Sequence, residues 1–487
     1  MNLATIIEGH DPDHPALVSR GRVTTYGTLR DQVARVRGAL AARGVEPGDR
    51  VAIVAGNNWY FVAAYLGVLG AGAVAVPVNP QSPGPEVERE LRQVGARLVL
   101  VGPHGRAVVD TLDAADLPGF EGSAEIAGLL DADPAPLVER GSDDVAVLLF
   151  TSGTAGAPRP AMLTHGNLRS NIDQVLANPQ RPEGADDAAL CVLPLSHVFG
   201  LNAVLGVTLA VGGTVVLVER FDPHSTLAAV AEHGVTILTG VPAMWSAWAG
   251  LPDAPRDALA GVRMAVSGAA ALDPAVRRAV RDRFGVDLTE GYGLTEAAPA
   301  VTSGLGHDAP DGSIGVPLPG VAVRLVDASG EDALVGDPGE IWVKGPNVFR
   351  GYWHDDEATR AVLTGDGWLR TGDVAVVDDD GFLWLVDRVK DVVIVSGFNV
   401  FPAEVEDVLR LHPAVEAAAV VGVPHPHSGE AVKAFVVVAE GAHVDEDELA
   451  EHVCRHLARY KCPSAIAFVD ELPVGDTGKV LRRELRP

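Results

Sequence analysis

Short apolar runs alternate with amphipathic segments along the chain as far as about residue 310. Apolar runs of about four to eight residues bounded by Gly and Asp are typical of strands that are buried on both faces of a parallel sheet. The segments between these runs have the spacing of helices. The pattern therefore predicts an α/β fold in which helices flank mostly parallel sheets. The expected strands are 50–57, 73–79, 97–102, 144–151, 213–219, 234–241 and 261–268.

A different pattern follows between about residues 310 and 387. Apolar and polar residues alternate more strictly there, and turn sequences such as 378–381 (Asp-Asp-Asp-Gly) indicate hairpins. This stretch is expected to be a small β-rich subdomain of a large N-terminal domain, 1–387. Residues 388–487 mix helical and strand patterns, which predicts a small α+β domain with a tight boundary near Asp387–Lys390.

One uncharged stretch, Trp59–Val78, is long enough to span a bilayer. Three glycines and Pro77 interrupt it, however, and no cluster of Lys and Arg flanks it. It is therefore predicted to be a buried helix, a glycine turn and a buried strand. The N-terminal residues lack the basic and apolar regions of a signal peptide. We expect a soluble cytoplasmic protein without a transmembrane segment.

Composition and charge narrow the classes of function. The chain has 487 residues, of which 47% are hydrophobic, so it can form several domains with sizeable cores. It carries 38 Lys and Arg against 65 Asp and Glu, a formal net charge of −27. No nucleic-acid partner is expected, because a nucleic-acid binder needs a basic surface. An anionic small molecule would have to be bound by local hydrogen-bond donors and cations, because the electrostatic field of the whole protein repels it. The oligomeric state is left open, and a homodimer is compatible with the sequence.

The chain contains three cysteines, Cys191, Cys454 and Cys462. No two of them have the C-x-x-C spacing, so neither a zinc site nor a disulfide framework is predicted. Reduced thiols are the expectation for a cytosolic protein.

A loop rich in Gly and hydroxyl residues, 150–159 (Phe-Thr-Ser-Gly-Thr-Ala-Gly-Ala-Pro-Arg), connects a predicted strand to a helical segment. Glycines allow backbone N–H groups to face a phosphate, and hydroxyls and a cation add to its binding. The loop is not a P-loop, because the Gly-Lys-Ser/Thr ending is absent. Alone, it fits an ordinary turn as well as a phosphate site.

Four further segments follow this loop in order. They are 292–296 (Tyr-Gly-Leu-Thr-Glu), 371–373 (Thr-Gly-Asp), 387–399 with its Asp-Arg-Val-Lys-Asp and Ser-Gly-Phe-Asn sequences, and 473–479 (Pro-Val-Gly-Asp-Thr-Gly-Lys). Together with the loop they resemble the motifs of the adenylate-forming (AMP-binding) superfamily, and bacterial fatty-acyl-CoA synthetases in particular. The resemblance covers essentially the whole chain. It implies a ligase that uses ATP, Mg²⁺ and coenzyme A, with a mobile C-terminal domain.

The resemblance assigns the 150–159 loop to the β- and γ-phosphates of ATP. Three positions depart from the family pattern, because Ala155, Arg159 and Pro160 stand where Thr, Lys and Gly are usual. Arg159 can still pair with phosphate, whereas Pro160 stiffens the loop and removes an N–H donor. The residues expected at the phosphates are Thr151, Ser152, Gly153, Thr154, Gly156 and Arg159.

The same resemblance places residues around the rest of the nucleotide. Glu296 is expected to bind Mg²⁺, a hard cation that prefers oxygen ligands, and Thr295 is expected to donate to the α-phosphate. Asp373 and Arg388 are expected to bind the ribose. Adenine is expected to stack on Tyr292 in a slot lined by Gly268, Ala269 and Ala270.

The C-terminal domain carries three residues with roles implied by the resemblance. Lys479 is expected to be the catalytic lysine of adenylation, because an ammonium between carboxylate and α-phosphate stabilises the developing charge. Lys390 is expected to be the hinge on which the domain rotates. Gly397 is expected to lie against pantetheine after rotation, where a Cβ would not fit. Its Ser-Gly-Phe-Asn context favours CoA over a carrier protein.

The resemblance also assigns the acid to segments 194–200 and 241–245 and to Gly291. These segments contain no Lys, Arg, Asp or Glu, and a buried unpaired charge is strongly disfavoured. An uncharged, apolar tail is therefore expected rather than a dicarboxylate or an amino acid. His197 is either a gate or donor to the acid, or a packed core residue.

A medium- or long-chain fatty acid is the favoured substrate. An aryl acid of the coumarate or benzoate kind is the alternative, since Phe199, Trp245 and Tyr292 could form a flat slot. A non-catalytic nucleotide- or acyl-binding relative is the rival from a different class, and its support is the altered loop at Ala155 and Pro160.

The first test concerns Lys479. Lys479→Ala should reduce adenylation roughly 10²–10³-fold or more, the scale expected for removing a preorganised charge donor. Thioester formation from supplied acyl-AMP should largely survive. The two half-reactions are measured separately, by ATP–pyrophosphate exchange and by release of CoA thioester. Equal losses in both would contradict domain alternation.

Overall fold

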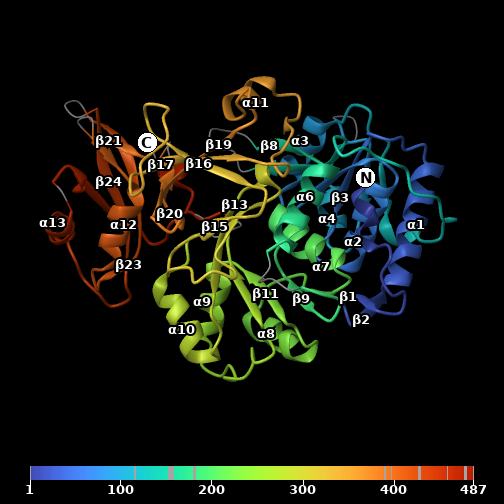
Figure 1. The fold of residues 1–487 in the computed structure, drawn as a ribbon, viewed down its shortest axis with the longest axis horizontal. Coiled ribbons are helices and arrows are strands. Elements are labelled where there is room, and N and C mark those ends of the chain that lie inside the picture. The colour runs from blue at the N-terminus through green and yellow to red at the C-terminus, as the bar shows by residue number, and fades with distance from the viewer. Residues whose placement is uncertain are drawn as a thin grey trace. The chain divides into compact units, whose positions relative to one another are not determined.

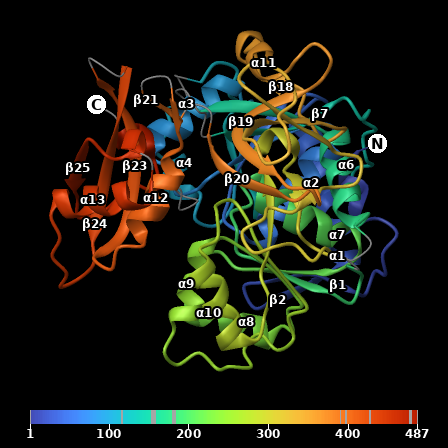
Figure 2. The same ribbon diagram turned by 60° about the vertical axis from the view of Figure 1, so that its left-hand side comes forward.

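The structure is a computed structural model that divides into two compact units (Figures 1 and 2). The first unit contains Met1–Ala322 and Val343–Leu369, and the second contains Val323–Trp342 and Arg370–Pro487. This division does not test the domain boundary expected near residue 388, which stays a prediction. The residues described are 2–113, 117–151, 158–178, 183–388, 391–395, 398–425, 429–457, 459–475 and 480–485.

The first sheet of the first unit has a parallel centre and antiparallel edges. Its strand order is β15-β14-β13-β12-β11-β9-β10-β1-β2. The pairs from β13 through to β1 are parallel, whereas β2, β14 and β15 are added in antiparallel fashion. The strands are β1 (Pro15–Ser19), β2 (Arg22–Thr25), β9 (Ala188–Cys191), β10 (Thr214–Leu217), β11 (Ile237–Gly240), β12 (Met264–Ser267), β13 (Thr289–Gly293), β14 (Ala300–Ser303) and β15 (Val316–Pro317).

The second sheet of this unit has the order β18-β8-β7-β4-β3-β5-β6. Its strands β7, β4, β3, β5 and β6 are parallel, and β8 and β18 run antiparallel at one edge. Each strand expected from the sequence contains a strand of one of these two sheets, so the predicted α/β class is confirmed. The strands are β3 (Arg50–Val54), β4 (Val74–Val78), β5 (Leu98–Val101), β6 (Ser123–Glu125), β7 (Val145–Thr151), β8 (Arg159–Thr164) and β18 (Gly351–Tyr352).

Helices of the first unit begin where side-chain oxygens satisfy the first backbone N–H groups. Thr25, Asn58, Thr164 and Asp222 each accept such a bond at a helix start. Helices α8, α9 and α10 lie together along the first sheet in both views (Figures 1 and 2). The helices are α1 (Tyr26–Ala42), α2 (Trp59–Gly70), α3 (Gly84–Val94), α4 (Arg106–Val109), α5 (Ile126–Leu129), α6 (His165–Leu176), α7 (Val207–Ala210), α8 (Pro223–Glu232), α9 (Pro242–Gly250), α10 (Pro274–Phe284), α11 (Asp356–Val362), the 3-10 helices η1 (Leu3–Ile7) and η4 (Thr295–Ala297), and the π-helix η3 (Phe199–Gly206).

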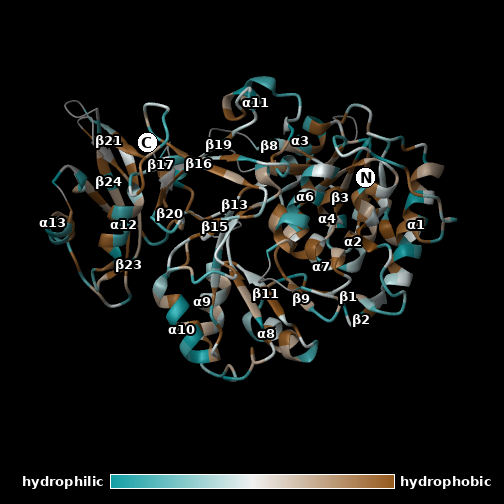
Figure 3. Ribbon diagram, in the orientation of Figure 1, coloured by the Kyte–Doolittle hydropathy of each residue, from teal (hydrophilic) through white to brown (hydrophobic). Residues whose placement is uncertain are grey.

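The uncharged stretch Trp59–Val78 forms helix α2, a turn at Gly72 and strand β4, as predicted. Both elements are buried, and Figure 3 shows strands such as β3 and β11 as apolar while the outer helices α1 and α10 carry hydrophilic residues. The uncharged stretch Trp59–Val78 is therefore long because both of its elements are buried inside the fold. None of the helices in the described part of the chain is long and apolar enough to cross a bilayer.

The second unit contains two small sheets. The first has the strand order β16-β17-β19-β20. Residues 378–382 close the predicted hairpin between its strands β19 and β20. The other has the order β22-β21-β24-β23, and β25 pairs with β24. The elements are β16 (Ala322–Val326), β17 (Gly339–Lys344), β19 (Leu369–Val377), β20 (Leu383–Arg388), β21 (Val393–Val395), β22 (Phe398–Val400), α12 (Pro402–Arg410), β23 (Val415–His425), β24 (Gly429–Val438), α13 (Glu446–His456), η5 (Arg459–Lys461), β25 (Ala465–Phe468) and α14 (Arg482–Leu485).

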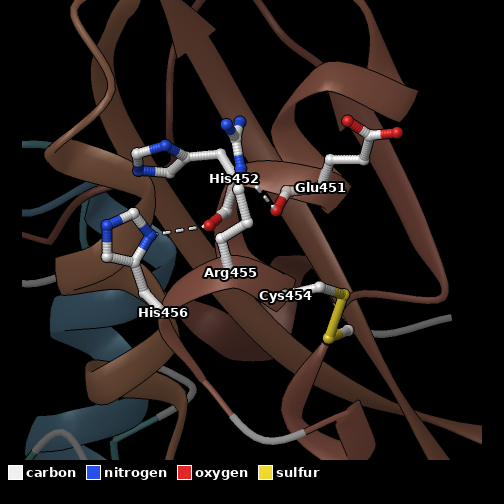
Figure 4. Close-up of a disulfide and its surroundings, with 6 residues drawn as sticks. Glu451, His452, Cys454, Arg455 and His456 are labelled. Atoms are coloured by element: carbon white, nitrogen blue, oxygen red, sulfur yellow. Dashed lines mark hydrogen bonds between the residues drawn. A yellow bond between two sulfur atoms is a disulfide. The ribbon is translucent and has the colours of Figure 1, made fainter.

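The structure corrects the expectation of three reduced thiols. Cys454 in α13 and Cys462, just after η5, form a disulfide with Cα atoms 5.4 Å apart (Figure 4), a separation that a disulfide can bridge. The C-x-x-C criterion missed this pair because the chain turns back between the two residues after α13. Cys191 is buried, and burial raises the pKa of its thiol to about 12, so it remains an unreactive thiol.

Thiol counting tests this disulfide. Under denaturing conditions the chain should show one reactive thiol before reduction and three after it. Closing so short a loop stabilises a fold by roughly 2.5 kcal/mol in the chain-entropy model. Reduction, or the pair Cys454→Ser and Cys462→Ser, should therefore lower the free energy of unfolding by about that amount. Three thiols without reductant would show that the bond is absent.

Candidate active site

The hairpin of β7 and β8 positions the two described ends of the glycine-rich loop. Thr151 and Arg159 are register partners, and Thr151 Oγ1 donates to the carbonyl oxygen of Arg159 over 3.4 Å. The hairpin therefore fixes Arg159 at the end of a buried strand. The other residues assigned to the phosphates, Ser152, Gly153, Thr154 and Gly156, lie outside the described residues.

A buried ion pair ties β13 to helix α10, and a hydrogen bond ties it to the loop after β12. Glu290 of β13 pairs with Arg277 of α10, and both side chains are buried. Glu290 also accepts a hydrogen bond from the N–H of Leu272 over 3.2 Å. The segment with Gly268 and the strand with Tyr292 are thus held as neighbours, because β12 and β13 also pair in parallel.

Three buried asparagines, Asn171, Asn202 and Asn347, hold the backbone that follows Glu296, and we call them the amide clamp. Asn347 Nδ2 donates to the carbonyl of Ala297 over 2.9 Å, and Asn202 Nδ2 donates to that of Ala298 over 2.7 Å. Asn171 donates to the carbonyl of Ala300 over 2.8 Å and accepts from its N–H over 3.1 Å. The clamp satisfies backbone groups that would otherwise be buried without partners.

The Glu296 carboxylate lies on a line of side chains that reaches Arg159. Tyr352 Oη donates to Glu296 Oε1 over 2.7 Å, and the N–H of Phe349 donates to the Glu296 carbonyl over 2.8 Å. The Arg159 guanidinium lies 5.9 Å from the centre of the Tyr352 ring. Its Nε is 3.1 Å from Asp355 Oδ2. Burial, and then the negative charge of Glu296, raise the pKa of Tyr352, so its phenol stays protonated as a donor.

The residues expected at adenine lie near the ends of β12 and β13. Gly268 directly follows β12, and a Cβ placed on it would lie 2.8 Å from Cζ of Phe199. Ala269 has a positive φ of 69°, and Tyr292 is buried in β13. Gly268, Ala270 and Tyr292 therefore lie at the same end of the sheet, and their roles at adenine stay predictions.

The segments assigned to the acid come from the turn after β9 and from α9. The N–H of His197 donates to the carbonyl of Pro194 over 3.0 Å, and its Nδ1 accepts from the N–H of Phe199 over 3.4 Å. These bonds orient the half-buried imidazole at the start of η3. Trp245, by contrast, is fully buried and packs edge-to-face on Trp248, with ring centres 5.3 Å apart. Trp245 is thus part of the apolar core.

The second unit holds the two residues expected at the ribose. Asp373 in β19 and Arg388 in β20 are register partners in an antiparallel pair. Asp373 is buried, its N–H donates to Thr371 Oγ1 over 3.1 Å, and that hydroxyl donates to the Ile341 carbonyl over 2.8 Å. The ladder thus places the two backbones opposite each other. Lys390, Gly397 and Lys479 lie outside the described residues.

The donor set near Glu296 fits Mg²⁺ as a cation shared with nucleotide phosphates. Within the described ranges, no group of three or more His, Cys, Asp or Glu side chains could hold a metal. Mg²⁺ commonly uses one or two carboxylates and takes its remaining ligands from water and phosphate. The partly exposed carboxylate of Glu296, which follows Thr295 in η4, offers an oxygen ligand of this kind.

Sequence reasoning missed Tyr352, Asp355 and the amide clamp. Tyr352 reaches Glu296 across 56 residues, and Asp355 reaches Arg159 across 196. No local pattern identifies such partners. The only available signal was the position of Asn202 in the apolar segment 199–206, and an asparagine is equally typical of capping and surface positions.

Comparison with known proteins identifies the family. The profile of the AMP-binding enzyme family matches residues 7–353, and that of the AMP-binding enzyme C-terminal domain matches 404–479. A feruloyl-CoA synthase from Amycolatopsis sp is 42% identical over 98% of this chain and 96% of that protein. A long-chain-fatty-acid–CoA ligase from Yersinia pestis is 37% identical over 97% and 91%. ATP-bound MatB from Rhodopseudomonas palustris is similar in structure, with a TM-score of 0.92, 33% identity, and coverage of 100% and 98%.

These matches define the class as adenylate-forming enzymes with a mixed α/β fold. The chain belongs to the AMP-binding enzyme family. The resemblance seen in the sequence is thereby confirmed. So is the expected enzyme class, the AMP-forming acyl-CoA ligases that use ATP, Mg²⁺ and CoA.

The contact between Gly268 and Phe199 can be tested by a double-mutant cycle. Gly268→Ala places a methyl group against the Phe199 ring, and overpacking of this kind costs about 1–3 kcal/mol. The KM for acid or ATP should rise about tenfold. Phe199→Leu removes the atoms in contact, so the double variant should resemble Phe199→Leu alone.

The matched control is Gly250→Ala, because a Cβ on Gly250 would meet nothing within 4 Å. It should leave both KM values unchanged. Additive losses in the double variant would contradict the proposed contact.

Proposed function

We propose that this chain activates a carboxylic acid with an uncharged tail and transfers it to CoA. In the first half-reaction the carboxylate attacks the α-phosphate of ATP, which gives acyl-AMP and pyrophosphate. In the second, the CoA thiol displaces AMP. The observation that carries the proposal is the placement of Glu296 at the end of β13, held by Tyr352 and joined through that ring to Arg159. A carboxylate for a metal and a cation for phosphate are thus provided within one unit.

The chain's own residues take the following parts in this proposal. Arg159 and the other residues assigned in the 150–159 loop bind the outer phosphates, and Thr295 donates to the α-phosphate. Glu296 holds Mg²⁺, which neutralises phosphate charge when bound. Tyr292 and the Gly268–Ala270 segment receive adenine, and Asp373 with Arg388 receives the ribose. Lys479 orients the reacting carboxylate and stabilises charge on the α-phosphate.

The two half-reactions are proposed to use different faces of the C-terminal domain, residues 388–487. Lys390 is the proposed hinge, and Gly397 is the proposed neighbour of pantetheine. Support comes from the separate family profile for residues 404–479. The Lys479→Ala experiment described above tests this part independently of the identity of the acid.

An aryl acid is the first candidate substrate. The feruloyl-CoA synthase relative supports it, as does the pairing of half-buried Phe199 with Gly268, which leaves the ring edge at a position without a Cβ. A fatty acid, which the sequence alone favoured, is the second candidate, supported by the long-chain ligase relative and by the apolar η3 and α9. Within 194–200 and 241–245, His197 is the one ionisable side chain, so a charged tail would lack a partner.

An ATP–pyrophosphate exchange panel tests the proposal. It compares cinnamates, benzoates, fatty acids from acetate to palmitate, malonate and amino acids at equal concentration. Exchange should be fastest with an uncharged acid, and the ratio of kcat/KM for cinnamates and fatty acids decides between the two candidates. Malonate or an amino acid as the best substrate would overturn the uncharged-tail proposal. Silence with every acid, despite ATP binding, would favour a non-catalytic nucleotide-binding protein.

A further inference from the structure

Tyr352 holds Glu296 through a hydrogen bond, but it has been given no role of its own in the proposed reaction. Tyr352 Oη lies 2.7 Å from Glu296 Oε1, and the ring is only 8% exposed. One carboxylate oxygen therefore receives a proton donor from the protein core. The Glu296 backbone is fixed separately, through Phe349 and the amide clamp.

The Tyr352 ring itself is held in one place by its surroundings. Strand β18 pairs with β8, which sets Tyr352 opposite Ala161. The ring packs edge-on against Phe349 with centres 5.0 Å apart, and the Tyr352 N–H donates to Thr359 Oγ1 over 2.9 Å. A donor fixed in this way selects one orientation of the carboxylate it binds.

Carboxylates that bind metals usually accept such a bond from an outer partner, which orients them. The loss of such a partner typically reduces metal affinity or activity by about 10–100-fold. We propose that Tyr352 is a positioning residue that presents the Glu296 carboxylate to Mg²⁺. The inference rests on the proposed function, in which Glu296 is the metal ligand.

Tyr352→Phe is the decisive variant, because it removes the hydroxyl and keeps the ring. The packing on Phe349 and the position beneath Arg159 are retained. The Mg²⁺ concentration that gives half-maximal pyrophosphate exchange should rise by about 10–100-fold. Calorimetry without acid should show the same weakening of ATP binding in Mg²⁺, and unchanged ATP binding in EDTA.

Tyr26→Phe is the matched control. Tyr26 is fully buried, and its hydroxyl donates to the carbonyl of Gly213 over 2.8 Å. The variant therefore loses a buried tyrosine hydrogen bond of the same kind. It should be less stable, and its Mg²⁺ dependence should match that of the unmodified chain.

A further variant, Glu296→Gln, separates the two levels of the proposal. If Glu296→Gln abolishes the Mg²⁺ dependence of ATP binding and Tyr352→Phe leaves it unchanged, the positioning role is wrong and the proposed function stands. If neither variant changes it, the metal assignment of Glu296 fails with the inference. Equal weakening of ATP binding with and without Mg²⁺ in Tyr352→Phe would indicate a merely structural role and overturn the inference.

Discussion

The buried amide clamp on residues 297–300 is the constraint on which the site in the first unit depends. The chain turns there from β13 to β14, and carbonyls at this turn find their partners in Asn202 and Asn347 rather than in a strand. An unpaired buried carbonyl costs about 1–3 kcal/mol, so the turn is stable in this form only while the amides are in place. Glu296 immediately precedes this turn. Its position is therefore set by the core and not by a surface loop.

A second interaction, the hydrogen bond from Tyr352 to Glu296, connects the two sheets of the first unit. Glu296 follows β13 of one sheet, whereas Arg159 and Tyr352 belong to β8 and β18 at the edge of the other. The phenol hydroxyl joins the carboxylate side to the cation side. A shift of one sheet relative to the other would lengthen this bond, which makes the distance between Glu296 and Arg159 a property of sheet packing. Rigid elements position a site more accurately than loops do.

Local patterns were sufficient for the seven expected strands of the first unit and for the motifs, but not for strands such as β8 and β9. Buried parallel strands are continuous apolar runs, and the uncharged stretch at Trp59 was recognisable as helix and strand from its glycines. The disulfide between Cys454 and Cys462 was missed because spacing rules cover motifs, not chains that turn back. Tyr352 and the amide clamp were missed for a related reason. Their partners are defined by tertiary contacts over 50 to 130 residues, and side chains of the same types occur at many surface positions.

The net charge of −27 bears on how Arg159 is held in the site. The sequence led us to expect local cations that oppose an acidic molecule, yet Arg159 is already paired with Asp355. Both side chains are about one-third exposed, and ion pairs of this kind contribute only about 1 kcal/mol or less. In the proposed function, nucleotide phosphate replaces Asp355 on Arg159 at little cost, since a phosphate group carries more charge and binds arginine with two parallel bonds. Asp355 keeps the guanidinium beside the Tyr352 ring. On the proposed function, this pair holds the cation in place in an acidic protein until phosphate binds.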